Sequence, residues 1–263
     1  MRWCRFEHKN ASSFGIIEDD KIIPVAGSPF GSYERLKTRV SLARAKLLAP
    51  VDKPIFYATS RNYRKNLQDS IGRSNRIFAM AEPWAGYRAA SAITGPDADV
   101  VIPSDCPDDV YFQGEIVVVI GKKARHLTHD GARDAIFGYT IGNDVTCDTW
   151  ATTDTRSWRG KNVDTWKPLG PWIETELDVD KAMCRVRYNG QELVGWNINQ
   201  WYFSPADVLV AITRYITVNP GDILMMGTEG VRSPYVKHGD QVEVEVSGLG
   251  TLRNRFVKSV DWY

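Results

Sequence analysis

The chain has 263 residues, of which 43% are hydrophobic and 25% are charged, a composition typical of a folded globular protein. Lys and Arg number 33 against 32 Asp and Glu, so there is no strong positive field to hold a polyanion, and nucleic acid is not expected as a partner. The longest apolar runs, such as residues 116–120, are far shorter than the roughly 20 residues that span a bilayer. No membrane partner is expected either.

The first 54 residues are predicted to form a small N-terminal β/α domain. Short apolar segments separated by turn-forming residues indicate strands between residues 3 and 25. Leu36, Val40, Ala43 and Leu47 recur at helical spacing, which predicts an amphipathic helix that closes this domain.

Residues 55–263 are predicted to form one larger domain, so that the whole chain has an α+β fold rich in strands. Its clearest helix is expected at 204–215, where Ser204 and Asp207 form a capping box around Pro205 at the first helical position. The chain is expected to end in a β-hairpin over 242–257. Further strands are predicted at 55–59, 99–102, 115–120, 139–145, 184–188 and 241–246.

The cysteines give no sign of a metal site or a disulfide framework. Cys4, Cys106, Cys147 and Cys184 are widely spaced and form no C-x-x-C pair, so we predict four buried, unpaired thiols. The first residues lack the apolar stretch of a signal peptide, which favours a reducing, cytoplasmic location.

Four common catalytic motifs are absent. The sequence contains no G-x-G-x-x-G, no G-x-x-x-x-G-K-[ST], no G-x-S-x-G and no H-E-x-x-H. Nucleotide binding, esterase chemistry and zinc-protease chemistry therefore lack their usual sequence support.

The most informative strand lies at 111–121. Gln113 and Glu115 are two residues apart and so point to the same face, and the apolar run that follows them is typical of a strand buried on both faces. A carboxylate at the start of such a strand requires a partner. That partner is either structural, as a cation or a backbone N–H, or a hard metal ion. The strand alone favours neither of these two alternatives. Asp144 follows a second apolar stretch further along the chain.

These segments resemble the fumarylacetoacetate hydrolase family. The resemblance implies a mixed β-roll catalytic domain at 55–263 behind a small N-terminal domain at 1–54, usually paired as a homodimer. The family's short motifs occur in order as Asn62-Tyr63, Glu115 to Lys122, Asn143-Asp144-Val145-Thr146, Gly160-Lys161, Leu169-Gly170-Pro171-Trp172, Pro220-Gly221-Asp222, Gly227-Thr228 and His238-Gly239-Asp240.

The resemblance also implies a divalent metal, Mg²⁺ or Mn²⁺, at Gln113, Glu115 and Asp144. In the family this metal holds neighbouring oxygens of a 2-oxo acid or 1,3-dicarbonyl and stabilises an enolate. Gln113 stands where the family has a glutamate, so the expected site has two formal negative charges instead of three and a weaker affinity for metal. Lys161 matches a family lysine that adds positive charge.

The substrate is expected to be a small carboxylate. The resemblance places its binding at the Gly227-Thr228 turn, with Thr228 bonding a substrate carboxylate. Tyr63 and Arg61 are also expected to bind the substrate, since Arg61 can pair with an anion. Glu229 replaces the proline that commonly follows the Gly-Thr pair.

The expected catalytic residues are Lys161, Asp69 and Asn66. The family often has N-Y-x-x-H-x-x-E from the position of Asn62 and activates water with its His and Glu. Here these two positions are Asn66 and Asp69. An amide has no useful basicity, so Asp69 is left as the proton carrier.

Three functions are compatible with these residues. The first is hydrolysis of an acylpyruvate-type diketone through a metal-stabilised enolate. The second uses the same enolate without activating water, as in a decarboxylase, tautomerase or dehydratase, and agrees better with Asn66. The third is a degenerate family member that binds a ligand and catalyses nothing.

Overall fold

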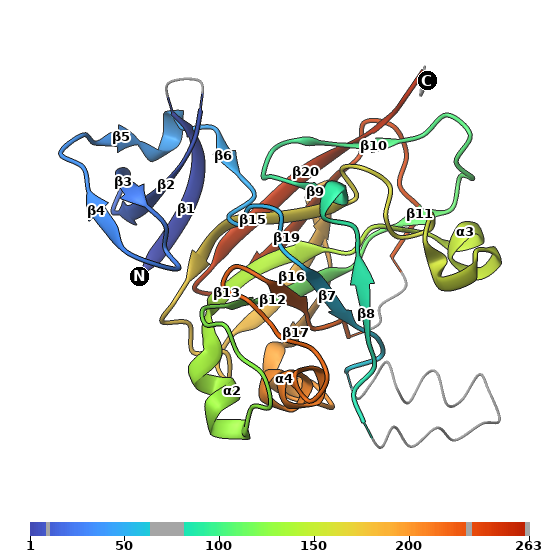
Figure 1. Ribbon diagram of the computed structural model, residues 1–263. Helices are drawn as coiled ribbons and strands as arrows, with labels where there is room; N and C mark the ends of the chain where they lie inside the picture. The colour runs from blue at the N-terminus through green and yellow to red at the C-terminus, as the bar shows by residue number, and fades with distance from the viewer. Residues whose placement is uncertain (9–10, 64–81, 230–232, 261–263) are drawn as a thin grey trace.

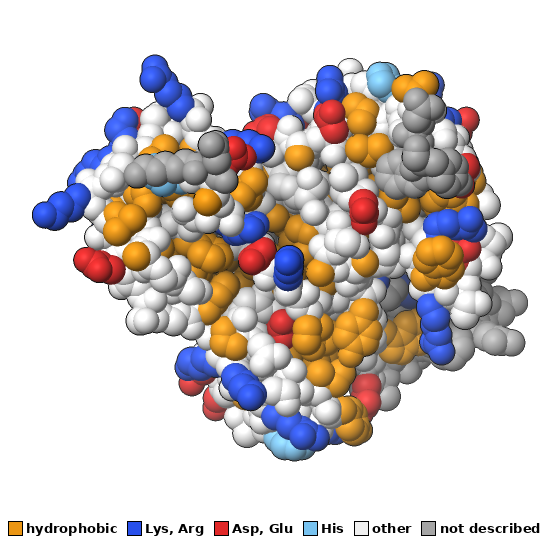
Figure 2. Space-filling model, turned by 45° about the horizontal axis from the view of Figure 1, so that its top comes forward, with side chains coloured by type: hydrophobic (Ala, Val, Ile, Leu, Met, Phe, Trp, Pro, Cys, Tyr) orange, Lys and Arg blue, Asp and Glu red, His pale blue; other side chains and the backbone are white. Residues whose placement is uncertain are grey.

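The structure of the protein is a computed structural model that describes residues 1–8, 11–63, 82–229 and 233–260. Two β-sheets make up most of it, with the N-terminal strands at one side and the helices at the periphery (Figure 1). Basic and acidic side chains are interspersed on the face shown in Figure 2, in agreement with the formal net charge of +1.

The larger sheet has 13 strands and runs from the N-terminal unit through the centre of the molecule. Its strands are β1 (Arg2–His8), β2 (Ala11–Glu18), β3 (Lys21–Gly27), β4 (Tyr33–Arg35), β5 (Val40–Ser41), β6 (Leu47–Leu48), β7 (Phe56–Thr59), β8 (Ala85–Arg88), β9 (Ile93–Thr94), β12 (Gly114–Ile120), β13 (Ile136–Asn143), β15 (Lys167–Glu174) and β18 (Ile223–Met225). The main path of neighbours is β4-β3-β2-β1-β15-β13-β12-β18-β7-β8. Strand β12 lies between two neighbours, and its seven residues are all buried, as its continuous apolar run predicts.

The second sheet packs against the first across the main hydrophobic core. Its strands are β10 (Asp99–Ile102), β16 (Met183–Tyr188), β17 (Gln191–Asn197), β19 (Gln241–Val246) and β20 (Gly250–Lys258). They have the order β10-β20-β19-β16-β17. A separate pair is formed by β11 (Val110–Tyr111) and β14 (Thr146–Cys147). Gly114 lies at a close contact between the two sheets, because a Cβ there would come within 2.8 Å of both Val186 and Val244.

The predicted elements of the larger domain are largely confirmed. Strands occur at each expected place, although β13 ends at Asn143 and leaves Asp144 just beyond it. Helix α4 (Pro205–Thr213) has the predicted capping box between Ser204 and Asp207. The other helices are α2 (His129–Ala135), which lies beside α4, and α3 (Asp148–Thr153), with 3-10 turns at Leu42–Arg44, Ala90–Ala92, Thr155–Ser157 and Ile198–Gln200.

The helix predicted from Leu36, Val40, Ala43 and Leu47 is wrong. Val40 pairs with Ile22 in β5, and Leu47 pairs with Phe6 in β6, so this segment completes the backbone hydrogen bonds of β3 and β1. Leu36 is 41% exposed, which shows that the four apolar positions do not share one buried face. Pairing with distant strands therefore outweighs the local helical spacing.

The N-terminal strands continue into the main sheet. Strand β1 pairs with β15, with Trp3 opposite Ile173, and the N-terminal amine lies 2.7 Å from Glu174 Oε1. The domain boundary after residue 54 stays a prediction. The four cysteines are free and buried, as predicted. Among the described residues, none of the helices has the length and apolar character needed to cross a bilayer.

Candidate active site

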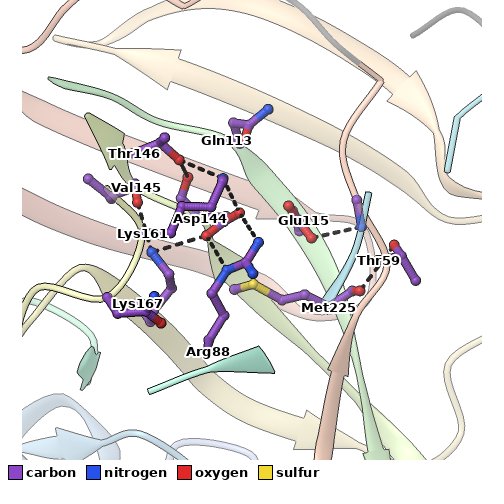
Figure 3. A network of polar contacts seen from close by, with 12 residues as sticks. Thr59, Arg88, Gln113, Glu115, Asp144, Val145, Thr146, Lys161, Lys167 and Met225 are labelled. Carbon is purple, nitrogen blue, oxygen red and sulfur yellow. Dashed lines mark hydrogen bonds and ion pairs between the residues drawn. The ribbon is translucent and has the colours of Figure 1, made fainter. Parts of the chain in front are cut away.

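Pairing between β12 and β13 brings Gln113, Glu115 and Asp144 to one end of the main sheet (Figure 3). Glu115 lies opposite Gly142 in this pair. Just beyond the paired residues, the Asp144 N–H donates to the Gln113 carbonyl at 2.9 Å. The Gln113 N–H in turn donates to the side-chain oxygen of Asn143 at 3.0 Å. These bonds join the ends of the two strands that carry Glu115 and Asp144.

Three cationic side chains surround the buried carboxylate of Asp144 (Figure 3). Arg88 reaches both oxygens, with Nη2 3.0 Å from Oδ2 and Nε 3.2 Å from Oδ1. Lys161 Nζ lies 2.7 Å from Oδ2, and Lys167 Nζ lies 3.0 Å from Oδ1. Burial alone raises the pKa of Asp144, but the charges of these three cations outweigh it and hold the pKa well below its usual range.

Lys167 is a fully buried lysine at the start of β15. Besides Asp144, its ammonium donates to the carbonyl of Val145 at 2.7 Å and to that of Trp166 at 3.0 Å. These three acceptors match the three N–H donors of an ammonium group. Burial lowers the pKa of Lys167 to about 7, and the charge of Asp144 opposes this effect.

Lys161 is the lysine that the sequence motif predicts, and the structure brings it to Asp144. It also donates to Thr146 Oγ1 at 2.7 Å. Its third N–H finds no acceptor among the residues that the structure describes. Since its side chain is 19% exposed, this donor is available to a ligand oxygen.

Glu115 is held by the backbone of the Gly227-Thr228 turn. Its Oε2 accepts a hydrogen bond from the Gly227 N–H at 2.7 Å. Burial, followed by repulsion from Asp144, raises the pKa of Glu115 to about 8. Gly227 has a φ of +87°, which side-chain-bearing residues rarely adopt, so the glycine allows this turn to reach Glu115. The neighbouring Thr228 is buried.

The other predicted residues lie on the segment that follows β7. Asn62 is structural, since its side chain bonds the carbonyls of Phe203 and Met226 and accepts from the Phe203 N–H. Tyr63 is buried and donates its hydroxyl to the Ile198 carbonyl at 3.2 Å. The structure therefore uses both side chains for packing, and a substrate contact of Tyr63 stays a prediction.

Arg61 is the exposed member of the same segment. Its guanidinium lies 6.0 Å from the ring centre of Trp84. Asn66 and Asp69, two of the expected catalytic residues, lie outside the described residues. Their roles stay predictions.

Sequence reasoning missed two of the three cations at Asp144. Lys167 could have been recognised from the sequence, because it is a charged residue at the start of an apolar segment that includes Leu169. Glu115 was recognised from the same pattern. Arg88 carried none, since it lies 56 residues before Asp144 and in no recognised motif.

A cleft of about 1110 Å³ opens beside Arg88. Arg88 lines this cleft while its guanidinium also contacts Asp144, so it connects the open cleft with the buried centre. The aromatic lining includes Trp150, which is buried, and Tyr87 and Trp158, which are more than half exposed. In the structure all three line the cleft.

The residues present do not fit a bound divalent cation well. Both oxygens of Asp144 already accept from side-chain cations, and Gln113 contributes no charge. Arg88, Lys161 and Lys167 carry three formal positive charges against two negative charges on Glu115 and Asp144. Within the described ranges, no cluster of three or more His, Cys, Asp or Glu residues is placed to hold a metal. A divalent ion would therefore enter a centre that is already positive.

Two family models cover most of the chain. The model described as "Fumarylacetoacetate (FAA) hydrolase C-terminal" matches residues 56–257. The model described as "Rv2993c-like, N-terminal" matches residues 1–50.

Individual relatives carry several activities. The mitochondrial oxaloacetate tautomerase Fahd2a of Rattus norvegicus is 31% identical over 251 residues, which cover 85% of this chain and 78% of the relative. The crystal structure of 5-carboxymethyl-2-hydroxymuconate delta-isomerase from Mycobacterium smegmatis superposes with a TM-score of 0.88 at 30% identity, covering 98% of this chain and 100% of that one.

A maleylpyruvate hydrolase from Sphingobium sp. SYK-6, solved with manganese(II) and pyruvate, has the same fold, with a TM-score of 0.79 at 21% identity. The matched regions are 98% of this chain and 100% of the hydrolase.

Proposed function

Because this chain is an enzyme of the fumarylacetoacetate hydrolase family, we propose that it catalyses the keto–enol tautomerisation of a small 2-oxo dicarboxylic acid at the centre around Asp144. The observation that carries this proposal is the group of three cations at a buried carboxylate, together with one N–H of Lys161 that has no acceptor among the described residues. Enolisation of a 2-oxo acid develops negative charge on the carbonyl oxygen. A preorganised cation in a buried site stabilises that charge.

The roles follow from the chemistry of each group. Lys161 presents its third N–H to the substrate's 2-oxo group, while Asp144 and Thr146 hold the amine in place. Arg88 faces the cleft and attracts the substrate carboxylates. Gly227 lies next to Glu115, and its neighbour Thr228 is assigned the bond to a substrate carboxylate that the family resemblance implies.

Tautomerisation agrees better with Asn66 than hydrolysis does. The reaction moves one proton from the carbon beside the carbonyl to the carbonyl oxygen, and it consumes no water and breaks no carbon–carbon bond. It therefore needs no water-activating histidine, which the sequence lacks at Asn66. Asp69 remains the proposed carrier of the proton.

The substrate class follows from the same arrangement and from the names of the relatives. Oxaloacetate is the 2-oxo dicarboxylate on which the rat relative acts. The three cations supply the positive charge that a dianion of this size needs when it leaves water.

The test is a direct comparison of three reactions on one preparation. Oxaloacetate in its enol form is added, and decay of the ultraviolet absorbance of the enol reports tautomerisation, while pyruvate formation reports decarboxylation. An acylpyruvate is assayed in parallel for hydrolysis. We expect enol decay well above the buffer rate with little pyruvate. Hydrolysis of the acylpyruvate with enol decay at the buffer rate would contradict the proposal.

A further inference from the structure

We infer that this centre works without a divalent metal ion, because the side chains of Lys167 and Arg88 occupy the oxygens of Asp144 through which such an ion would bind. The inference depends on the proposed function only for the reaction that the centre catalyses. Whether a metal binds is decided by the residues themselves.

The first argument is the occupation of Asp144. A metal bound at this carboxylate needs a free lone pair on one of its oxygens, directed towards the ion. Here Oδ1 accepts from Arg88 and Lys167, and Oδ2 accepts from Arg88 and Lys161. A divalent ion would have to displace at least one cation.

The second argument is that Lys167 is firmly held. Its side chain has no exposed surface, and its ammonium also donates to the carbonyls of Val145 and Trp166. Strand β15 is fixed at the same residue, because Lys167 pairs with Ile93 of β9. Moving the Lys167 ammonium aside to make room for a metal would break its bonds to both carbonyls inside the protein, which is costly.

The third argument is charge. With Gln113 neutral, the centre has two carboxylates and three cationic side chains, a formal excess of one positive charge before any ligand enters. A dication would be repelled, whereas an anionic substrate or an enolate would be attracted. The side-chain cations supply the positive charge that the reaction requires.

The decisive experiment is a titration of the full-length, chelator-stripped protein with Mn²⁺, followed by the paramagnetic resonance signal of free Mn²⁺. We expect no saturable site up to about 1 mM Mn²⁺. Metal analysis of the purified protein should find no stoichiometric divalent metal. Saturable binding of one Mn²⁺ to the unmodified chain would overturn the inference.

Two substitutions should convert the centre into a metal site. Gln113→Glu restores a third carboxylate, and Lys167→Met removes the buried ammonium while keeping similar volume. The double variant should bind one Mn²⁺ at least about 100-fold more tightly than the unmodified chain, because its formal charge is lower by two. Lys181→Met is the matched control, since Lys181 is an exposed lysine paired with Asp178. It should leave the titration unchanged.

The outcomes separate the inference from the proposed function. A folded double variant that still binds no Mn²⁺ would overturn the role given to Lys167 and Gln113. If the double variant does not fold, the single variant Gln113→Glu and the unmodified chain can still be titrated with Mn²⁺, and these two titrations then test the inference. Absence of tautomerase activity with and without added metal would overturn the proposed function, while the Mn²⁺ titration would continue to decide the inference.

Discussion

The ammonium nitrogen of Lys167 lies 3.0 Å from Oδ1 of Asp144, although the lysine side chain is completely buried. A buried ion pair of this kind contributes little net stability, because both charges lose their hydration. Its effect here is to hold Asp144 in place while Arg88 and Lys161 contact the same carboxylate. The carboxylate thus acts as an anchor for three cations.

Replacement of Lys161 tests the catalytic role directly. Lys161→Met should lower the rate of enol decay by about 100-fold or more, because it removes a preorganised donor from the developing oxyanion. The measurement is the oxaloacetate assay combined with circular dichroism to verify the fold. Lys181→Met should retain full activity. An unchanged rate in Lys161→Met would remove this lysine from the mechanism.

Asp144→Asn is expected to destabilise the protein. The variant keeps the volume but removes the carboxylate that pairs with the buried Lys167 and with its two cationic neighbours, at a cost of about 3–5 kcal/mol in the free energy of unfolding. Urea denaturation measures this change. Asp178→Asn, in an exposed pair with Lys181, should give no measurable change. Equal stability of the two variants would argue against Asp144 as the anchor.

Gly227→Ala separates backbone strain from a role in the site. Gly227 has a φ of +87° and Gly190 has a φ of +80°, but only Gly227 donates its N–H to Glu115. Alanine at either position should reduce stability by roughly 1–2 kcal/mol, since a left-handed backbone disfavours side chains. Only Gly227→Ala should also lose activity. Thermal melts and the enol assay give both quantities, and full activity in Gly227→Ala would show that the turn is dispensable.

The cysteines should resist thiol reagents in the native protein. Burial raises the pKa of Cys4 to about 12 and the pKa of Cys147 to about 11. A raised pKa reduces the fraction of thiolate, the reactive form, at every pH below it. Labelling at about pH 8 should therefore be slow in the native state and reach all four thiols in denaturant. Rapid labelling of the native chain would place at least one thiol at the surface.

The sequence alone determined much of the larger domain because its signals are local. Alternating valines predict β19, and a serine, a proline and an aspartate at fixed spacing predict the start of α4 at Pro205. The apolar run after Glu115 predicts a buried strand for the same reason. Hydrophobic periodicity and capping depend on neighbours within a few residues, so they can be recognised without the tertiary structure.

Only the tertiary structure decided which groups meet at Asp144. Arg88 comes from the end of β8, and Lys167 comes from the start of β15; these strands lie on opposite sides of β12 and β13 in the sheet order. Long-range pairing also turned the segment between Leu36 and Leu47 into short strands. Strand order sets such contacts, and no local pattern encodes it, because the hydrogen bonds that define a sheet join residues far apart in the chain.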